Sequence, residues 1–203
     1  MRTKTKALVL ALCAVLLVVA TVFVTMAYLT SQDSVTNTFT VGQVNITLDE
    51  AKVDEYGEEE EGASRVDANT YKLIPGHTYT KDPQIHVDTN SEDCYLFVKI
   101  ENGLGTDGTI NGLEGNGWKA VANQPGIYCY YGIDAEGALN RDKKIVKANE
   151  DIDVFDTFTF GEKAEPNNYD TATKNAKIIV TAYAIQADGL SEKTPAEIWA
   201  LFK

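Results

Sequence analysis

Short runs in which apolar and polar residues alternate one by one recur along most of this 203-residue chain. In the clearest run, Cys94, Leu96, Val98 and Ile100 fall on one face of an extended strand. Further runs of the same period lie at 43–48, 127–131, 152–160 and 177–186. A period of two is typical of strands with a buried face, and the β-branched and aromatic residues in these runs suit a pleated sheet. The pattern predicts an all-β protein.

Turn-forming residues separate these runs and keep the connections short. Pro75-Gly76, the glycine-rich stretch 103–117, Pro125-Gly126 and Pro166-Asn167-Asn168 all interrupt the alternation. About eight short strands with no helix-length crossover between them favour antiparallel pairing over a parallel α/β sheet. We therefore expect an antiparallel β-sandwich of jelly-roll type.

One short helix is expected at the C-terminus, over residues 194–202. Thr194-Pro195-Ala196-Glu197 combines an N-cap threonine, a proline at the first helical position and a glutamate three residues after the cap. Ile198, Trp199, Leu201 and Phe202 then form an apolar patch. We expect this helix to pack against the sandwich.

The N-terminus has the pattern of an export signal. An apolar stretch runs from residue 7 to 26, and three cations precede it, namely Arg2, Lys4 and Lys6. Small residues at Thr25 and Ala27 predict cleavage between Ala27 and Tyr28, so that residues 1–27 are a signal peptide helix and 28–203 a single domain. The same stretch is long enough for a retained membrane anchor. Both alternatives place the domain outside the cytoplasm, secreted or at the cell surface.

The charge of the chain limits its partners. The net charge is −12, and removal of the signal would take three cations away. Such a chain is repelled by nucleic acid and by anionic lipid, so we expect no nucleic-acid partner and membrane contact only through an uncleaved N-terminal segment. Nine acidic residues gather at 49–67, which predicts a solvated loop or, alternatively, a divalent-cation patch.

Two cysteines remain after the signal, Cys94 and Cys129, each within an apolar run. In an exported domain an even number of cysteines favours a disulfide, which would stabilise this fold by roughly 3–4 kcal/mol. The alternative is a pair of reduced, buried cysteines that fill space as small apolar side chains.

Catalytic motifs are missing from the sequence. The two histidines, His77 and His86, lie in strand-and-turn sequence, form no HExxH pair and are expected at the surface. The chain contains neither a GxSxG turn nor a P-loop. We therefore predict no catalytic residue, no metal and no cofactor, and a structural or binding role.

Several segments together resemble the TasA/camelysin family of exported bacterial proteins, which are processed by a dedicated signal peptidase. These segments span both ends of the chain: 25–30, 37–42, 44–48, Pro75-Gly76, 79–83, 94–101 and 182–189. The resemblance implies a jelly-roll sandwich and, for fibre-forming members, a subunit of the biofilm matrix or the cell surface. The implied partners are copies of the chain itself, the signal peptidase and other matrix or surface proteins.

In the fibre-forming members the mature N-terminal strand is donated to the next subunit. The matching segment here is 28–41, in which Val35, Phe39 and Val41 would fill pockets of the neighbour. The same alternation would also serve an ordinary first strand folded into its own domain. Two other functions stay open: a camelysin-type metalloprotease, for which no zinc motif is present, and a monomeric surface adhesin that uses Trp118, Tyr128 and Tyr130.

Overall fold

The computed structural model of the chain describes residues 5–6, 12–17, 43–140, 142–169 and 176–202. The chain divides into two units, residues 1–40 and 41–203, and the described strands all belong to the second. In the first unit, residues 12–17 are α-helical. Within the described ranges, no helix has both the length and the apolar character needed to cross a membrane. The predicted signal helix over 1–27 lies mostly outside the described residues.

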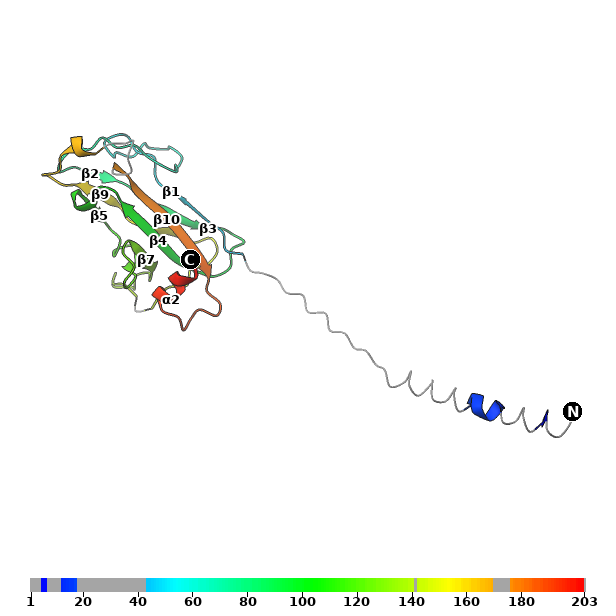
Figure 1. Ribbon diagram of the computed structural model, residues 1–203. Helices are drawn as coiled ribbons and strands as arrows, with labels where there is room; N and C mark the ends of the chain where they lie inside the picture. Colours follow the sequence, from blue (N-terminus) through cyan, green and yellow to red (C-terminus); the bar gives the residue numbers. More distant parts are fainter. Residues whose placement is uncertain (1–4, 7–11, 18–42, 141, 170–175, 203) are drawn as a thin grey trace. The chain divides into compact units, whose positions relative to one another are not determined.

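The second unit is built from antiparallel strands in three sheets (Figure 1). The first sheet has the order β1-β3-β8, the second β10-β4-β7-β6 and the third β2-β9-β5. The strands are β1 (Ile46–Asp49), β2 (Thr78–Thr80), β3 (Gln84–Val87), β4 (Cys94–Asn102), β5 (Gly108–Asn111), β6 (Trp118–Ala120), β7 (Ile127–Tyr130), β8 (Asp151–Asp153), β9 (Thr157–Phe160) and β10 (Ile178–Gln186). Two short 3-10 turns, Gly105–Asp107 and Pro166–Asn168, lie in the connections.

Strand β4 lies inside the four-stranded sheet and is buried on both faces. Its neighbours are β10, which pairs with it along all nine residues, and β7. Leu96 and Phe97 are both fully buried, although consecutive side chains of a strand point to opposite faces. Both faces of this sheet must therefore be covered.

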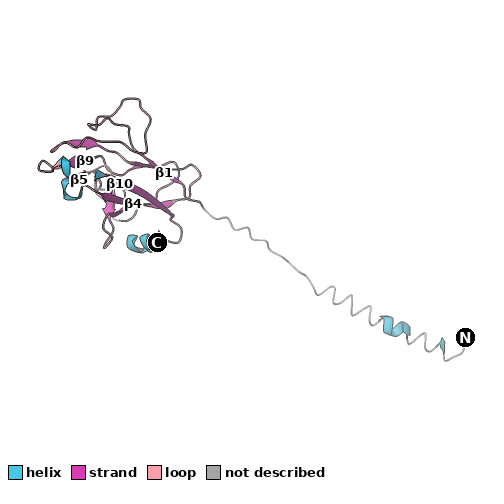
Figure 2. Cartoon of the chain, turned by 45° about the horizontal axis from the view of Figure 1, so that its top comes forward, coloured by secondary structure: helices cyan, strands magenta, loops and turns pink. Residues whose placement is uncertain are grey.

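The first face of this sheet packs against the sheet β1-β3-β8. Leu96 and Val98 of β4 share one hydrophobic cluster with Ile85 of β3 and Ile152 of β8. Two sheets that enclose such a cluster form a sandwich-like core. Figure 2 shows β1 on one side of β4 and β10 and the C-terminal helix on the other.

The second face is covered by helix α2 (Pro195–Trp199) and the 3-10 turn Ala200–Phe202 that follows it. Trp199 packs against Phe97 and Tyr183, with ring centroids 5.8 and 4.9 Å away. The predicted capping box is present: the Thr194 hydroxyl accepts from the Glu197 N–H, and the Glu197 carboxylate accepts from the Thr194 N–H. The helix prediction is confirmed.

The third sheet continues the first across a bend. Residues 81–83 separate β2 from β3. They lie opposite residues 154–156, which separate β8 from β9. Lys81 N–H still donates to Asp156 O, and Val154 N–H to Pro83 O, so the two breaks remain paired. Pro83 has no N–H, which interrupts a regular ladder at this point. The bend places Lys81 at the junction of two sheets.

Most of the predicted runs are strands, and the expected all-β, sandwich-like architecture with a C-terminal helix is confirmed. The run predicted at 152–160 proves to be two strands, because its backbone bends at 154–156. The sequence analysis did not predict β2, β3, β5 and β6, because a run of three or four residues is too short to show a period of two.

The helix that covers the second face can be tested by side-chain truncation. Trp199→Ala should lower the free energy of unfolding by about 3–5 kcal/mol, because it opens a cavity beneath the helix. Leu201, which is 52% exposed, is the matched control, and Leu201→Ala should change stability by less than about 0.5 kcal/mol. Urea unfolding measures both variants. Equal losses would show that the helix does not cover this face.

Candidate functional site

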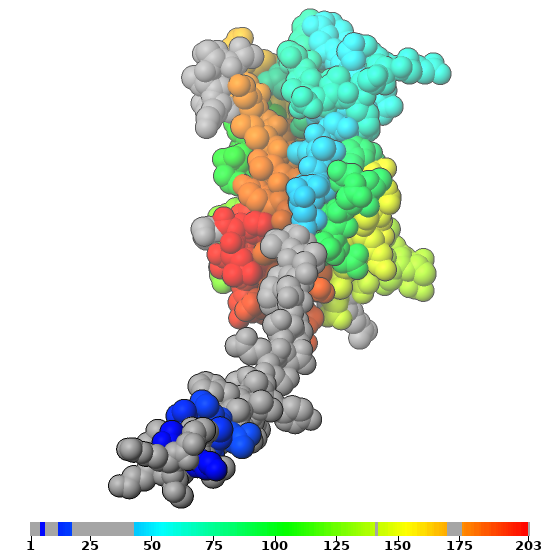
Figure 3. Space-filling model, turned by 90° about the vertical axis from the view of Figure 1, so that its right-hand side faces the viewer, coloured from blue at the N-terminus to red at the C-terminus, as the bar shows by residue number. Residues whose placement is uncertain are grey.

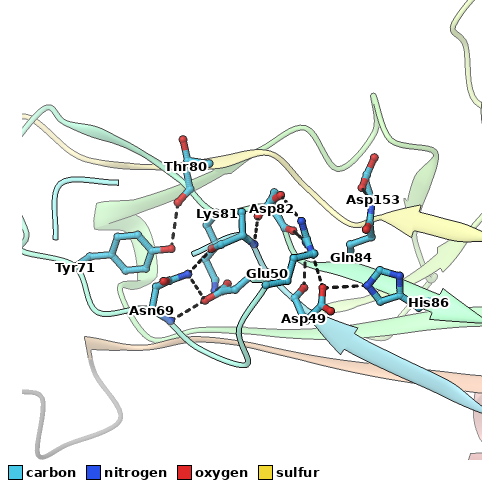
Figure 4. Close-up of polar contacts among 12 residues, drawn as sticks. Asp49, Glu50, Asn69, Tyr71, Thr80, Lys81, Asp82, Gln84, His86 and Asp153 are labelled. Carbon is cyan, nitrogen blue, oxygen red and sulfur yellow. Dashed lines mark hydrogen bonds and ion pairs between the residues drawn. The ribbon is translucent and has the colours of Figure 1, made fainter. Parts of the chain in front are cut away.

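A polar cluster lies where β1 ends and the bend between β2 and β3 begins (Figure 4). Its side chains come from the end of β1, from the acidic loop and the residues just after it, from the bend and from strand β3. They bond to one another in two groups, one half-exposed and one buried. The members of this polar cluster are Asp49, Glu50, Arg65, Asn69, Lys81, Asp82 and His86.

Arg65 organises the half-exposed group. Its Nε donates to the Asp49 carboxylate, and its Nη1 and Nη2 donate to the Asp82 carboxylate and carbonyl at 3.1 and 2.8 Å. Planar guanidinium groups suit such multiple contacts. Arg65 therefore ties the acidic loop both to the end of β1 and to the bend.

His86 lies in the same group between two carboxylates. Its Nε2 is 3.0 Å from Asp49 Oδ1 and its Nδ1 is 2.7 Å from Asp151 Oδ1. Burial alone would lower the pKa of His86, but the hydrogen bonds and charges of Asp49 and Asp151 outweigh burial and raise it. For Asp49, burial favours a higher pKa, whereas hydrogen bonds from Arg65 and His86 leave its pKa below the usual value. His86 thus joins its own strand β3 to β1 through Asp49 and to β8 through Asp151.

The buried group centres on Glu50. Its side chain is 5% exposed and pairs with Lys81, whose side chain is 11% exposed. The other carboxylate oxygen accepts from Asn69 Nδ2 at 3.0 Å and from Asn69 N–H at 2.8 Å. Tyr71 lies beside this group, and burial, with the nearby charge of Glu50, raises the pKa of the Tyr71 hydroxyl.

A cavity of about 890 Å³ adjoins the buried group. It lies between the end of β1 and the start of β10, and Glu50, Asn69 and Lys81 are among its polar lining residues. The other walls are largely apolar and come from β1, β9, β10 and the loops: Leu48, Tyr71, Leu73, Leu104, Phe158, Ile178 and Val180.

Strands β1 and β10 are the terminal strands of their sheets, and they lie side by side next to this cavity (Figure 3). Gly103 N–H donates to Lys177 O, and Ala187 N–H to Asp93 O, which fixes the register of β10 on β4. Alternate residues of β10 therefore direct their N–H and C=O groups away from β4. These residues are Ile178, Val180, Ala182, Ala184 and Gln186.

In the part of the chain that the structure describes, no strand pairs with that outer side of β10. The nine residues of β10 are all at least partly exposed, unlike those of β4. Ile179, at 36% exposed, is among the more exposed large apolar side chains. An edge of this length can accept a further strand.

The structure places the two histidines apart. His77 Nε2 bonds to Tyr56 O at 2.8 Å, and its ring packs edge-on against Tyr79. Among the described residues, no group of three or more His, Cys, Asp and Glu side chains is arranged to hold a metal ion. Within the acidic loop, Glu60 pairs with Lys52 at 2.7 Å, and both side chains are exposed.

The predicted disulfide between Cys94 and Cys129 is not formed, and both thiols are free and buried. Cys129 lies directly opposite Phe97, whereas Cys94 points to the other face of β4. The two cysteines accordingly belong to different hydrophobic clusters. A disulfide would need both thiols on one face, whereas this sheet has a core on each face, so the structure agrees with the alternative of two reduced, buried cysteines.

The aromatic residues considered for an adhesin are not an exposed platform. Trp118 is fully buried, and its indole Nε1 donates to Asp153 O at 2.7 Å. Tyr130 is 8% exposed and packs on Trp118, and Tyr128 packs against the same cluster. They fill the core.

Five predicted site residues lie outside the described residues: Ala27, Tyr28, Val35, Phe39 and Val41. The structure therefore leaves the cleavage site and the donor strand as predictions.

Sequence reasoning did not single out the polar cluster. Glu50 looked like one of nine acidic residues in a solvated loop. The available signal was the alternation of apolar residues, because Glu50 follows β1 directly and continues the spacing of Ile46 and Leu48, so a carboxylate extends an apolar stripe. Its partners lie far along the chain and come together only through the bend.

Comparisons with known proteins add no relative. No protein-family model matches the chain, and no curated protein matches it significantly. The fold and the site define the protein as an all-β, sandwich-like protein in which no described strand pairs with the outer edge of β10 and in which buried Glu50 contacts Lys81 and Asn69 beside a cavity.

The histidine bridge predicts a pH-dependent stability. Because the folded pKa of His86 is raised, its contribution is fully present below the unfolded value of about 6.5 and is lost as the pH rises through the folded value. Replacement by asparagine should therefore destabilise the protein more at about pH 5 than at about pH 9. Urea unfolding of wild type and His86→Asn at both pH values measures this. A loss of equal size at both would rule out the bridge.

The free thiols predict slow alkylation of the folded protein. Burial raises the pKa of Cys94 to about 11 and that of Cys129 to about 12, so little thiolate is accessible. Iodoacetamide at about pH 8 should modify both only after denaturation, as read by peptide mass spectrometry. A non-reduced peptide pair that joins Cys94 to Cys129 would contradict the structure.

Proposed function

We propose that this protein is a structural subunit of extracellular or cell-surface fibres of a bacterium, in which each copy donates its N-terminal segment to the next. The observation that carries the proposal is the outer edge of β10, with which no described strand pairs, beside a cavity that has apolar as well as polar walls. The order of sequence motifs that resembles the TasA/camelysin family supports it as well.

The segment 28–41 suits the donor role chemically. Its main chain would bond to the outward N–H and C=O groups of β10, as in β-strand addition generally. Val35, Phe39 and Val41 fall at odd positions and would share one face of the added strand. The cavity wall near Ile178 and Val180 offers apolar surface to that face.

A contact of this kind is head-to-tail, so each added copy leaves a new free edge and growth continues into a filament. Cleavage between Ala27 and Tyr28 by a signal peptidase would free the segment from the membrane. Processing would then permit assembly as well as export. The finer architecture that accompanies this proposal is a jelly roll.

A second candidate function is a monomeric surface domain that binds a ligand. The cavity of about 890 Å³ favours it, since its size is that of a small-molecule site and it combines apolar walls with a few polar groups. The two functions differ in their need for the edge of β10, because fibre assembly requires a strand to pair with it and ligand binding in the cavity does not.

The fibre proposal predicts that blocking the edge stops assembly. Val180→Pro removes an outward N–H but leaves the bonds of β10 to β4 intact, because those use the alternate residues. Electron microscopy of the processed protein should show filaments for wild type and none for Val180→Pro or for a chain lacking 28–41.

Val180→Thr is the matched control, because it has a similar shape and keeps the N–H. It should still form filaments. Circular dichroism and urea unfolding establish that each variant is folded. Filaments that persist in the folded proline variant or in the deletion would remove the donor-strand proposal. A processed wild-type protein that forms no filaments would favour the monomeric binding domain.

A further inference from the structure

Fibre assembly does not explain why the carboxylate of Glu50 is buried. Among the described residues, Glu50 is the one charged residue that is buried, with 3% of its surface exposed. Burying a Lys–Glu pair is expensive, and an apolar pair would often be as stable. A reaction between these groups offers a reason for their burial.

Glu50 lies between an amine and an amide. One carboxylate oxygen contacts Lys81 Nζ, and the other accepts from the side-chain amide of Asn69 at 3.0 Å. A single carboxyl group thus touches both a nucleophile and the nitrogen of a possible leaving group (Figure 4). This arrangement suits the passage of a proton from one to the other.

We propose that Lys81 and Asn69 become joined by an intramolecular isopeptide bond, with Glu50 as the proton carrier. First, a proton moves from the Lys81 ammonium group to Glu50, which turns two buried charges into neutral groups. The free amine then attacks Asn69 Cγ and gives a tetrahedral intermediate.

The bond Lys81 Nζ–Asn69 Cγ forms, and the bond Asn69 Cγ–Nδ2 breaks. Glu50 delivers its proton to Nδ2 and accepts one from the attacking nitrogen, so one ammonia leaves. The proton that Glu50 first took from the ammonium group finally leaves with the ammonia, as an ammonium ion. Glu50 therefore ends as the carboxylate that it was at the start. The reaction needs no oxidant, cofactor or second substrate.

The amide of Asn69 is held for this attack. Its carbonyl oxygen accepts from the Val53 N–H at 3.1 Å, which places a backbone donor where negative charge would develop. Its nitrogen also donates to Ala51 O at 2.8 Å, which fixes the plane of the amide. Fixed geometry of this kind replaces a costly encounter.

Asn69 is the electrophile in this proposal because Glu50 is needed as the proton carrier. While Glu50 holds the proton taken from Lys81 it is a neutral carboxyl group, and attack on it is the competing reaction. Attack on Glu50 would release water instead of ammonia. The two products therefore differ in mass and can be told apart.

The bond would fasten the acidic loop to the bend between β2 and β3. Residue 69 follows that loop, and residue 81 lies at the bend. Arg65 already joins the same two regions through hydrogen bonds. A covalent link at the buried end would make the connection permanent, independently of whether the protein forms fibres.

Mass spectrometry tests the proposal on the purified folded protein, with its N-terminus established by sequencing. The intact mass of the denatured chain should be lower than the sequence mass by one ammonia. Trypsin cleaves after unmodified lysine, so an acylated Lys81 should block cleavage before Asp82. The peptide map should contain one branched species that joins 66–72 to 73–99.

Glu50→Gln should restore the full sequence mass and cleavage at Lys81, because the proton carrier is gone. Lys52→Met is the matched control: Lys52 also pairs with a glutamate, Glu60, but in an exposed position. This control should keep the branched peptide. If Glu50→Gln does not fold, the wild-type peptide map decides by itself.

Three outcomes would overturn the proposal. The first is a folded wild-type chain at its full sequence mass with Lys81 cleaved. The second is loss of water with a bond between Lys81 and Glu50. The third is loss of ammonia with 66–72 and 73–81 as separate peptides, as succinimide formation at a step such as Asn111-Gly112 would give.

Discussion

Burial of β4 on both faces is the constraint on which the rest of the structure depends. A strand that carries Leu96 toward one side and Phe97 toward the other needs two covering layers. The sheet β1-β3-β8 supplies one and helix α2 the other. The same constraint separates the two cysteines, because Cys94 lies on the face of the sheet that Leu96 shares and Cys129 on the face that Phe97 shares.

The bend at residues 81–83 gives the fold its chemistry. Without this bend, β2 and β3 would form one regular ladder with β8 and β9, and the ladder would not direct Lys81 toward the end of β1. Because the ladder is interrupted, the Lys81 side chain lies at the junction of the two sheets, where it contacts Glu50 beside Asn69. Arg65 and His86 secure the more exposed side of the same junction with carboxylates.

The cavity and the outer edge of β10 lie on one side of this junction, so binding and covalent stabilisation would use adjoining surfaces. Glu50, Asn69 and Lys81 are among the residues that line the cavity, and so are residues of β10. A strand added to β10 would rest beside a region that hydrogen bonds and ion pairs hold together. Such preorganisation next to an acceptor edge lowers the entropy lost when a partner binds.

The sequence by itself determined the local structure: the period of two defined the longer strands, and Thr194-Pro195 with Glu197 defined the helix and its cap. Those signals arise from neighbours along the chain. Only the tertiary structure decided which faces meet, that Cys94 and Cys129 point apart, and that Glu50, Asn69 and Lys81 converge. These depend on register, on a bend and on contacts between distant residues, and alternation alone carries no information about which strands become partners.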